Sequence, residues 1–330
     1  MKKILLSVFA VAALASCIQN ETINPQTPIG FGDAYVQNST KAIYEGTNYV
    51  KAFQVWGTVT SAAGTVALYE GANVEDTTAE DVNNYGEAWS CDVQRFWTPD
   101  CDYNFYAVVD ADADGVNATD GVPSTIEYTA VPAGDKDLLY GATFKTTKTG
   151  LAQPTTGQLV AFTMEHLLSK ISFTFTNPAS NGDYSYNVTG VTVEGTYASG
   201  VYTIAHAAAN IDGNYEGTWA GDGTASPLSF GAVAATLASS ETGAAAKSCV
   251  IIPGKPALTI KVATETVFGG KVMTTKTHTL TVNATAEDKD VTFEKNTHYN
   301  FAVPLPAPGV EIQLTIGTVE GFVDEPVTNL

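Results

Sequence analysis

"KISFTFT", residues 170–176, alternates apolar and polar side chains without interruption after its first residue. Ile171, Phe173 and Phe175 fall on one side of an extended chain, and the serine and threonines between them fall on the other. This period of two predicts a β-strand with one face in a hydrophobic core. A helix would need apolar residues three and four positions apart instead.

The same kind of strand signal recurs along the chain, in short runs rich in Val, Thr, Tyr and Phe that are separated by Gly, Asn, Asp and Pro. Short strand-forming runs separated by turn residues predict an all-β protein of sandwich type. The expected strands are 29–36, 52–59, 103–110, 125–131, 190–195, 201–204, 257–264, 277–284, 299–305 and 311–316. Helical turns are expected only in 162–170 and in the Ala-rich stretch 232–246.

The composition narrows the class of function. The 330 residues are 44% hydrophobic and 15% charged, with a formal net charge of −19. Such a chain can bury substantial cores, and its negative surface disfavours nucleic acid and anionic lipid as partners. Arg95 is the single arginine, which further weakens any phosphate-binding interpretation.

The N-terminus "MKKILLSVFAVAALASC" has two lysines, a short apolar run and then small residues before Cys17. This order predicts an export signal over residues 1–16. Residues 14–17, Leu-Ala-Ser-Cys, resemble the lipobox of bacterial lipoproteins, which implies cleavage before Cys17 and lipid attachment to it. A polar tether follows, and residues 17–41 then form a lipidated leader that contains the short strand 29–36.

The other three cysteines are Cys91, Cys101 and Cys249. In an oxidising compartment Cys91 and Cys101 are a candidate disulfide across neighbouring strands, which leaves Cys249 as a free thiol in a strand. No CxxC or paired Cys/His spacing favours zinc.

"DADADG", residues 110–115, carries Asp110, Asp112 and Asp114 at the spacing of an EF-hand loop. Gly121 stands where that loop requires its bidentate glutamate, so an acidic turn is favoured over a calcium site. We predict no metal and no cofactor.

Catalytic motifs are also missing: no GxSxG, HExxH or P-loop is present, and the four histidines lie in different segments. We therefore do not expect an enzyme. Trp56, Trp89, Trp97 and Trp219 are expected in cores, although they could instead stack on sugars.

Several segments occur in an order that resembles one family. Lys41-Ala42 follows the leader strand, and "RFWTPDCDYNFYAV" (95–108) and "DKDLLYG" (135–141) come next. "VAFTMEHLLSKISFTF" (160–175) then matches F-x-x-x-H-L-x-S-K-I, and "YNFAVPL" (299–305) precedes a final strand-like segment. This order is similar to that of the fimbrillins, which are lipoprotein-derived pilus subunits of Bacteroidetes-type bacteria.

The resemblance implies two tandem transthyretin-like β-sandwich domains, here 42–157 and 158–330, and the proline- and glycine-containing stretch 149–157 is the candidate linker between them. It also implies a lipid-anchored precursor at the outer membrane, cleavage between Lys41 and Ala42, and assembly with other pilus subunits by donor-strand exchange. The family's protease favours arginine at the cut, so the lysine is a departure. The implied product is a cell-surface fimbrium that contributes to adhesion, with a target that the motifs do not specify.

Residues 310–323 are the candidate donor strand, with Val310, Ile312, Leu314 and Ile316 on one face. The alternative is that 311–316 is only the last strand of the second domain. The alternative function is an outer-membrane lipoprotein that binds glycans through its tryptophans.

Overall fold

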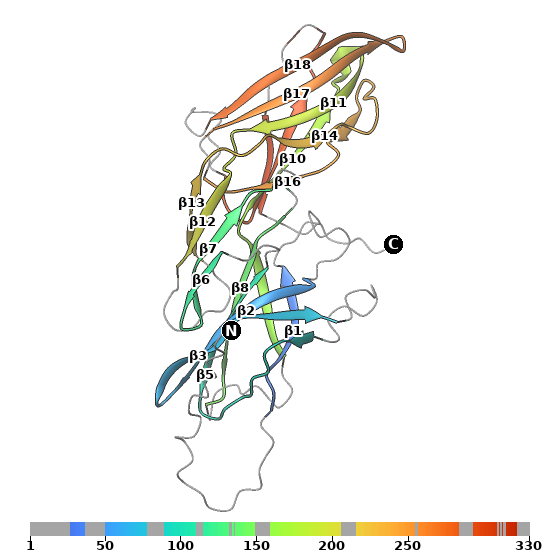
Figure 1. The fold of residues 1–330 in the computed structure, drawn as a ribbon. Helices are drawn as coiled ribbons and strands as arrows, with labels where there is room; N and C mark the ends of the chain where they lie inside the picture. Colours follow the sequence, from blue (N-terminus) through green and yellow to red (C-terminus); the bar gives the residue numbers. More distant parts are fainter. Residues whose placement is uncertain are drawn as a thin grey trace, which may run out of the picture.

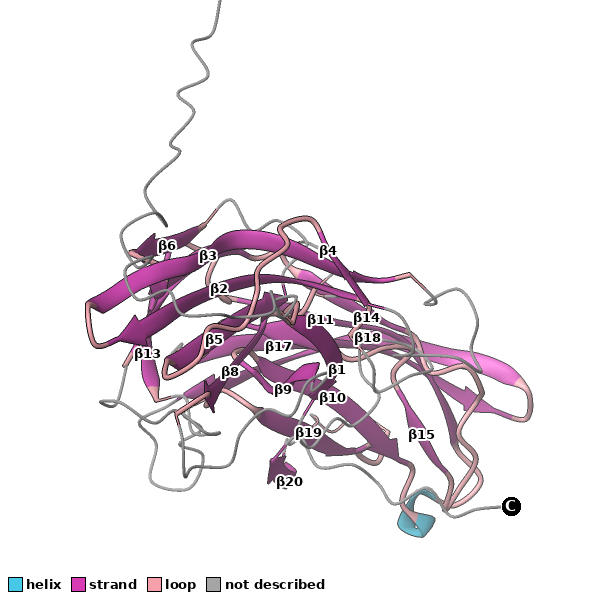
Figure 2. Ribbon diagram, turned by 90° about the horizontal axis from the view of Figure 1, so that it is seen from below, coloured by secondary structure: helices cyan, strands magenta, loops and turns pink. Residues whose placement is uncertain are grey.

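The structure is a computed structural model, and it describes residues 27–36, 50–77, 89–109, 115–131, 134, 136–148, 159–205, 216–254, 257–283, 293–308, 310, 312 and 315–321. Within these residues the chain is almost entirely β, and the one helix is a short 3-10 turn, Ala179–Asn181 (Figure 2). The all-β prediction is confirmed. Across the same residues no helix has the length and hydropathy needed to span a bilayer.

The N-terminal part of the chain forms a seven-stranded sheet in the order β1-β9-β8-β5-β2-β3-β4. Its strands are β1 (Gly30–Val36), β2 (Ala52–Ser61), β3 (Gly64–Asp76), β4 (Trp89–Cys91), β5 (Asp102–Val109), β8 (Leu139–Thr146) and β9 (Leu159–His166). One face of this sheet buries a cluster that we call the N-terminal core, which includes Phe31, Phe53, Tyr69, Phe105 and Phe162.

The C-terminal part is a sandwich of two sheets. The first sheet contains β10 (Ser169–Thr176), β15 (Thr242–Ala244), β16 (Cys249–Ile251), β19 (Thr297–Pro304) and β20 (Thr315–Gly321). The second sheet contains β11 (Ser185–Glu194), β14 (Leu228–Gly231), β17 (Ala257–Phe268) and β18 (Lys271–Asn283). Between them lies the C-terminal core, which includes Ile171, Phe173, Phe175, Val262 and Phe301. The alternation of residues 170–176 is thus confirmed, because Ile171, Phe173 and Phe175 are all buried.

A fourth sheet joins the two parts along one side of the molecule (Figure 1). Its order is β13-β12-β7-β6, with β6 (Val116–Thr119), β7 (Val122–Thr129), β12 (Ser199–Ile204) and β13 (Gly217–Asp222). Under it lies the junction core, which includes Trp56, Tyr106, Tyr140, Leu168 and Tyr202. Strand β5 is apolar on both faces because Phe105 points into the N-terminal core and Tyr106 into the junction core.

The strand pairing places the boundary of the two parts differently from the sequence prediction. Strand β9 lies beyond residue 157, yet it pairs with β1 and β8 in the N-terminal sheet. Strand β12 likewise belongs to the second half of the chain but pairs with β7 of the first. The change from one sheet system to the other therefore comes after His166, and the two halves share a core rather than meeting only at a linker.

Both predicted helical turns are wrong. Residues 162–166 belong to β9, and β10 begins at Ser169. In 232–246 the chain instead forms a bridge between Val233 and Ala245 and the short strand β15. Neither stretch has the sustained 3.6-residue pattern that a helix needs in order to bury one face.

Candidate functional site

The candidate site is the groove that holds strand β1, the strand predicted in the leader. Strand β1 pairs in parallel with β9, and Phe31 lies opposite Val160. On its other side, the segment just before β1 meets the segment after β4: the backbone N–H of Ile29 donates to the carbonyl of Arg95 at 2.8 Å, and that of Trp97 donates to Thr27 at 2.9 Å. Strand β1 is therefore one end of the seven-stranded sheet, and residues 27–29 before it bond to the segment that follows β4 at the other end.

Phe31 provides the main apolar contact in this groove. Its ring is 4% exposed and lies 5.6 to 6.4 Å, between ring centroids, from the rings of Tyr69, Phe53, Phe105 and Phe162. Burial of a phenylalanine side chain contributes about 1.5–3 kcal/mol, before the geometry of the ring contacts is counted. The N-terminal core is thus completed by a residue of the leader.

The glycines of β1 let its backbone approach β9 closely. A Cβ atom at Gly32 would lie 2.8 Å from the Cβ of Leu159, and one at Gly30 would lie 2.8 Å from Leu159 Cδ2. The register also shifts between Phe31 and Ala34. The glycines therefore fit the backbone of β1 against Leu159, which is half-exposed and would have to move to make room for a larger residue.

Arg95 holds in place the segment 95–97, which borders the groove of β1. Its Nε donates to the carbonyl of Leu68 at 2.8 Å, and its guanidinium lies 6.0 Å from the ring centroid of Tyr69. The only arginine of the chain is therefore a structural residue that fixes the segment 95–97 against β3.

Several predicted site residues lie outside the described residues. These are the lipidation site Cys17, the processing residues Lys41 and Ala42, the acidic turn Asp110, Asp112 and Asp114, and the donor residue Leu314. In the described part of the chain, no group of three or more His, Cys, Asp or Glu side chains is arranged to hold a metal ion.

The candidate donor segment is not the single strand that was predicted from Val310. Val310 is a half-exposed bend residue, whereas Ile312 is 3% exposed in the C-terminal core. Strand β20 begins only at Thr315, with Ile316 opposite Phe301 of β19. In this structure β20 is the edge strand of its own C-terminal sheet.

No disulfide links Cys91, Cys101 or Cys249, so the structure does not contain the candidate disulfide. Their strands are not neighbours, because β2 and β3 separate β4 from β5 in the sheet. Each thiol donates instead to a nearby backbone carbonyl at 3.3 Å, Cys91 to Val93 and Cys101 to Pro99. Burial raises the pKa of both thiols, which keeps them protonated at neutral pH.

The F-x-x-x-H-L-x-S-K-I motif forms a buried polar cluster where the two halves of the chain meet. His166 Nδ1 is bonded to the carboxylate of Asp137, which also accepts a hydrogen bond from the Leu138 N–H at 2.9 Å. Lys170 is buried opposite His298 on the neighbouring parallel strand. The motif therefore ties β9 and β10 to the segment around Asp137, which is a structural role.

Burial shifts the pKa values of two residues of this cluster, Lys170 and His298. Burial lowers the pKa of Lys170 to about 8, although the nearby carboxylate of Asp137 opposes the shift. Burial, together with the positive charge of Lys170, lowers the pKa of His298 to about 4. His298 is thus neutral at pH 7, and its Nε2 forms a 2.7 Å hydrogen bond with Ser172 Oγ.

Comparison with known proteins identifies the family. The family model described as fimbrillin-like matches residues 40–320. The chain belongs to the fimbrillin-like family. The match begins one residue before Lys41, so strand β1 lies outside it. No functionally curated protein matches the chain.

Two solved structures show that this fimbrillin-like chain shares a known fold. One is a fimbrial protein from Bacteroides vulgatus, with 18% identity and a TM-score of 0.52 over 90% of this chain and 99% of its own. The other is described as a putative cell adhesion protein from Bacteroides uniformis, with 14% identity and a TM-score of 0.51 over 92% of this chain and 100% of its own. At these identities the similarity establishes the fold.

Sequence reasoning missed the residues that surround β1. The alternation within 29–36 predicted the strand, but nothing local indicated that Leu159 and the segment 95–97 would flank it. The parallel pairing of β1 with a strand more than a hundred residues away is a long-range contact without a local signal.

Proposed function

We propose that this chain is a structural subunit of a cell-surface fimbrium, and that it assembles when a strand of another subunit replaces β1 by donor-strand exchange. The observation that carries the proposal is the position of β1. It fills the N-terminal core with Phe31, pairs with β9 at the end of the sheet, and precedes the start of the family match.

In this proposal the precursor reaches the outer membrane as a lipoprotein attached through Cys17. A protease that accepts lysine then cuts between Lys41 and Ala42, which detaches the segment that contains β1. Loss of β1 would leave unpaired backbone groups along β9 beside an apolar groove, a strongly unfavourable state in water. A strand from a second subunit restores the pairing, and repeated head-to-tail contacts build a filament.

The C-terminal segment 310–323 is the proposed donor. Strand β20 lies at a sheet edge and pairs only with β19 among the described strands. It must leave β19 before it can enter the groove of the next subunit. The apolar residues Val310, Ile312, Leu314 and Ile316 would then supply the alternate side chains that such a groove accepts.

A covalent lock on β1 tests this mechanism directly. Gly30 and Leu159 are register partners, and a Cβ at Gly30 points at the Leu159 side chain. The double variant Gly30→Cys/Leu159→Cys is expected to hold β1 in place by a disulfide even after cleavage. Oxidised protein should then stay monomeric in detergent gels, reduction should restore ladders that collapse only on strong heating, and Leu159→Cys alone should assemble normally.

Processing has its own test. Lys41→Ala should leave a larger, lipid-anchored species that does not polymerise, whereas Lys41→Arg should give a surface protein that begins at Ala42. An unchanged mature size in Lys41→Ala would show that the cut lies elsewhere. A lipidated Cys17 in all assembled protein would rule out strand replacement.

A further inference from the structure

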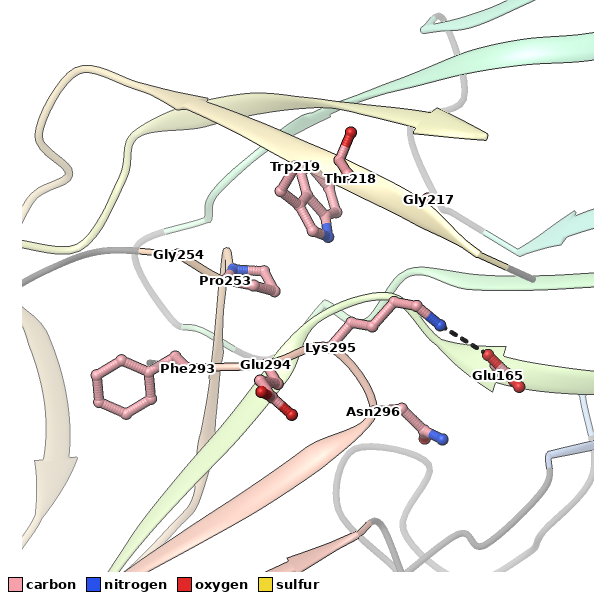
Figure 3. A pocket seen from close by; sticks show the side chains of 10 residues that line it. All are labelled: Glu165, Gly217, Thr218, Trp219, Pro253, Gly254, Phe293, Glu294, Lys295 and Asn296. Atoms are coloured by element: carbon pink, nitrogen blue, oxygen red, sulfur yellow. Dashed lines mark hydrogen bonds and ion pairs between the residues drawn. The ribbon is translucent and has the colours of Figure 1, made fainter. Parts of the chain in front are cut away.

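A pocket of about 640 Å³ lies at the junction of the two halves of the chain (Figure 3). It is bounded by β13 with Trp219, by Pro253, by the end of β9 with Glu165, and by the turn 293–296. Its volume falls in the range of about 300–1,000 Å³ that is typical of small-molecule sites. The groove of β1 does not include these residues, so the pocket is independent of the proposed assembly mechanism.

Trp219 is the aromatic wall of this pocket. Its indole Nε1 donates to the carbonyl of Leu167 at 2.7 Å, and its ring packs 5.4 Å from the ring of Tyr202. The side chain is therefore fixed, and it is partly exposed on the pocket side. All four tryptophans belong to or pack against a core: Trp56 and Trp219 at the junction core, and Trp89 and Trp97 on the N-terminal core. Of the four, Trp219 is the one that lines this pocket.

Polar groups face Trp219 and Pro253 from the opposite wall (Figure 3). Lys295 Nζ forms a 2.9 Å ion pair with Glu165 Oε2, so a donor and an acceptor lie side by side without net charge. Asn296 Oδ1 is buried and has no hydrogen-bond partner among the described residues. Because this oxygen is closed to solvent, the part of the amide that a ligand can meet is its Nδ2 group, a hydrogen-bond donor.

We propose that this pocket binds a neutral saccharide. A fixed indole opposite a proline offers an apolar surface for the C–H face of a sugar ring, and the ion pair and the amide offer partners for its hydroxyls. The exposed Glu294 and the net charge of −19 disfavour an anionic ligand. Such a site would allow the subunit to bind a glycan directly as well as to build a filament.

The test is a calorimetric titration of the full chain with D-galactose, D-mannose and N-acetylglucosamine, and with choline as a cationic competitor for the aromatic wall. At least one sugar should bind with 1:1 stoichiometry and a dissociation constant on the order of millimolar. Trp219→Ala should weaken that binding about tenfold or more. Asn296→Gly should weaken it about threefold, and glycine suits the positive φ of 54° at this position.

Two comparisons keep the result interpretable. Trp97→Phe alters a tryptophan outside the pocket and should bind like the unmodified chain, and Asn296→Gly leaves the junction core intact if Trp219→Ala fails to fold. Absence of binding for all three sugars, or binding that survives both pocket substitutions, would overturn the proposal. Binding of choline without binding of any sugar would also overturn the proposal, because it would show a site for a quaternary ammonium ion. None of these outcomes depends on whether the subunit polymerises.

Discussion

The hydrophobic cores of the N-terminal sheet and the C-terminal sandwich are completed by different kinds of segment. The N-terminal core is completed by β1, which is joined to the rest of the chain through residues 37–49 and the candidate cut at Lys41. The C-terminal core is formed entirely by residues after Leu168 and includes Ile312 near the end of the chain. A cut within residues 37–49 would therefore separate β1 from the N-terminal core and leave the C-terminal core unchanged.

The junction core reduces the independence of the two halves. Strands β7 and β12 pair across it, and Trp56, Tyr106 and Tyr202 fill it. Because none of these residues belongs to β1, the junction should survive when the N-terminal core opens. This contrast is compatible with the proposed strand exchange, in which β1 would be replaced while the junction core keeps the two halves aligned.

The largest effect is expected from removing β1 itself. A chain that starts at Ala42 should lose amide protection in β9 and β5, because β9 loses its parallel partner and Phe31 leaves the core. Strands β17 and β18 should stay protected. Hydrogen exchange followed by mass spectrometry measures both halves in one experiment, and a peptide of residues 27–37 should restore protection to β9. Equal loss in both halves would show that they form one cooperative unit.

The single side chain of Phe31 should account for much of this effect. Phe31→Ala is expected to lower the free energy of unfolding by about 3–5 kcal/mol, since it leaves a cavity among four aromatic rings. Met273→Ala is the control, because Met273 is 58% exposed on β18, and its change should be within about 0.5 kcal/mol. Urea unfolding measures both. Similar losses for the two variants would mean that β1 is not packed as described.

The sequence predicted the strands better than their neighbours. Residues 170–176 and 29–36 carry their own period of two, and both are strands. The run from Glu165 to Lys170 is buried at every position because it passes between two cores, so it has no period, and a helical turn was wrongly predicted there. Likewise, β5 was recognised as apolar on both faces, but its second partner, the sheet with β12, comes from distant residues.

A smaller effect is expected where β1 crosses β9. Gly32→Ala should cost about 1–3 kcal/mol, because the new methyl group would lie 2.8 Å from the Cβ of Leu159. Gly190→Ala is the control, since a Cβ there meets nothing within 4 Å. Leu159→Gly, which removes that Cβ, should recover most of the loss in the double variant, which urea unfolding of the four proteins can show. Additive losses would place Gly32 away from Leu159.

The smallest effect concerns the C-terminal half and depends on pH. The pKa of His298 is lowered to about 4, so between pH 6.5 and 4 the unfolded chain binds more protons than the folded one, and stability falls as the pH falls through this window. Because His298 is only partly buried and solvent screens it, its share is about 1–2 kcal/mol. Lys170, Ser172 and Asn300 face it from β10 and β19.

The variant His298→Gln isolates this contribution from that of the many carboxylates. The difference in unfolding free energy between His298→Gln and the unmodified chain should change by about 1–2 kcal/mol from pH 6.5 to pH 4.5 and stay constant above pH 7. Parallel curves across the whole range would mean that His298 does not titrate in this window. Since His298 lies in β19, acid should reduce amide protection around β10 and β19 while β1 and β9 keep theirs. Acid and removal of β1 would then weaken opposite halves of the molecule.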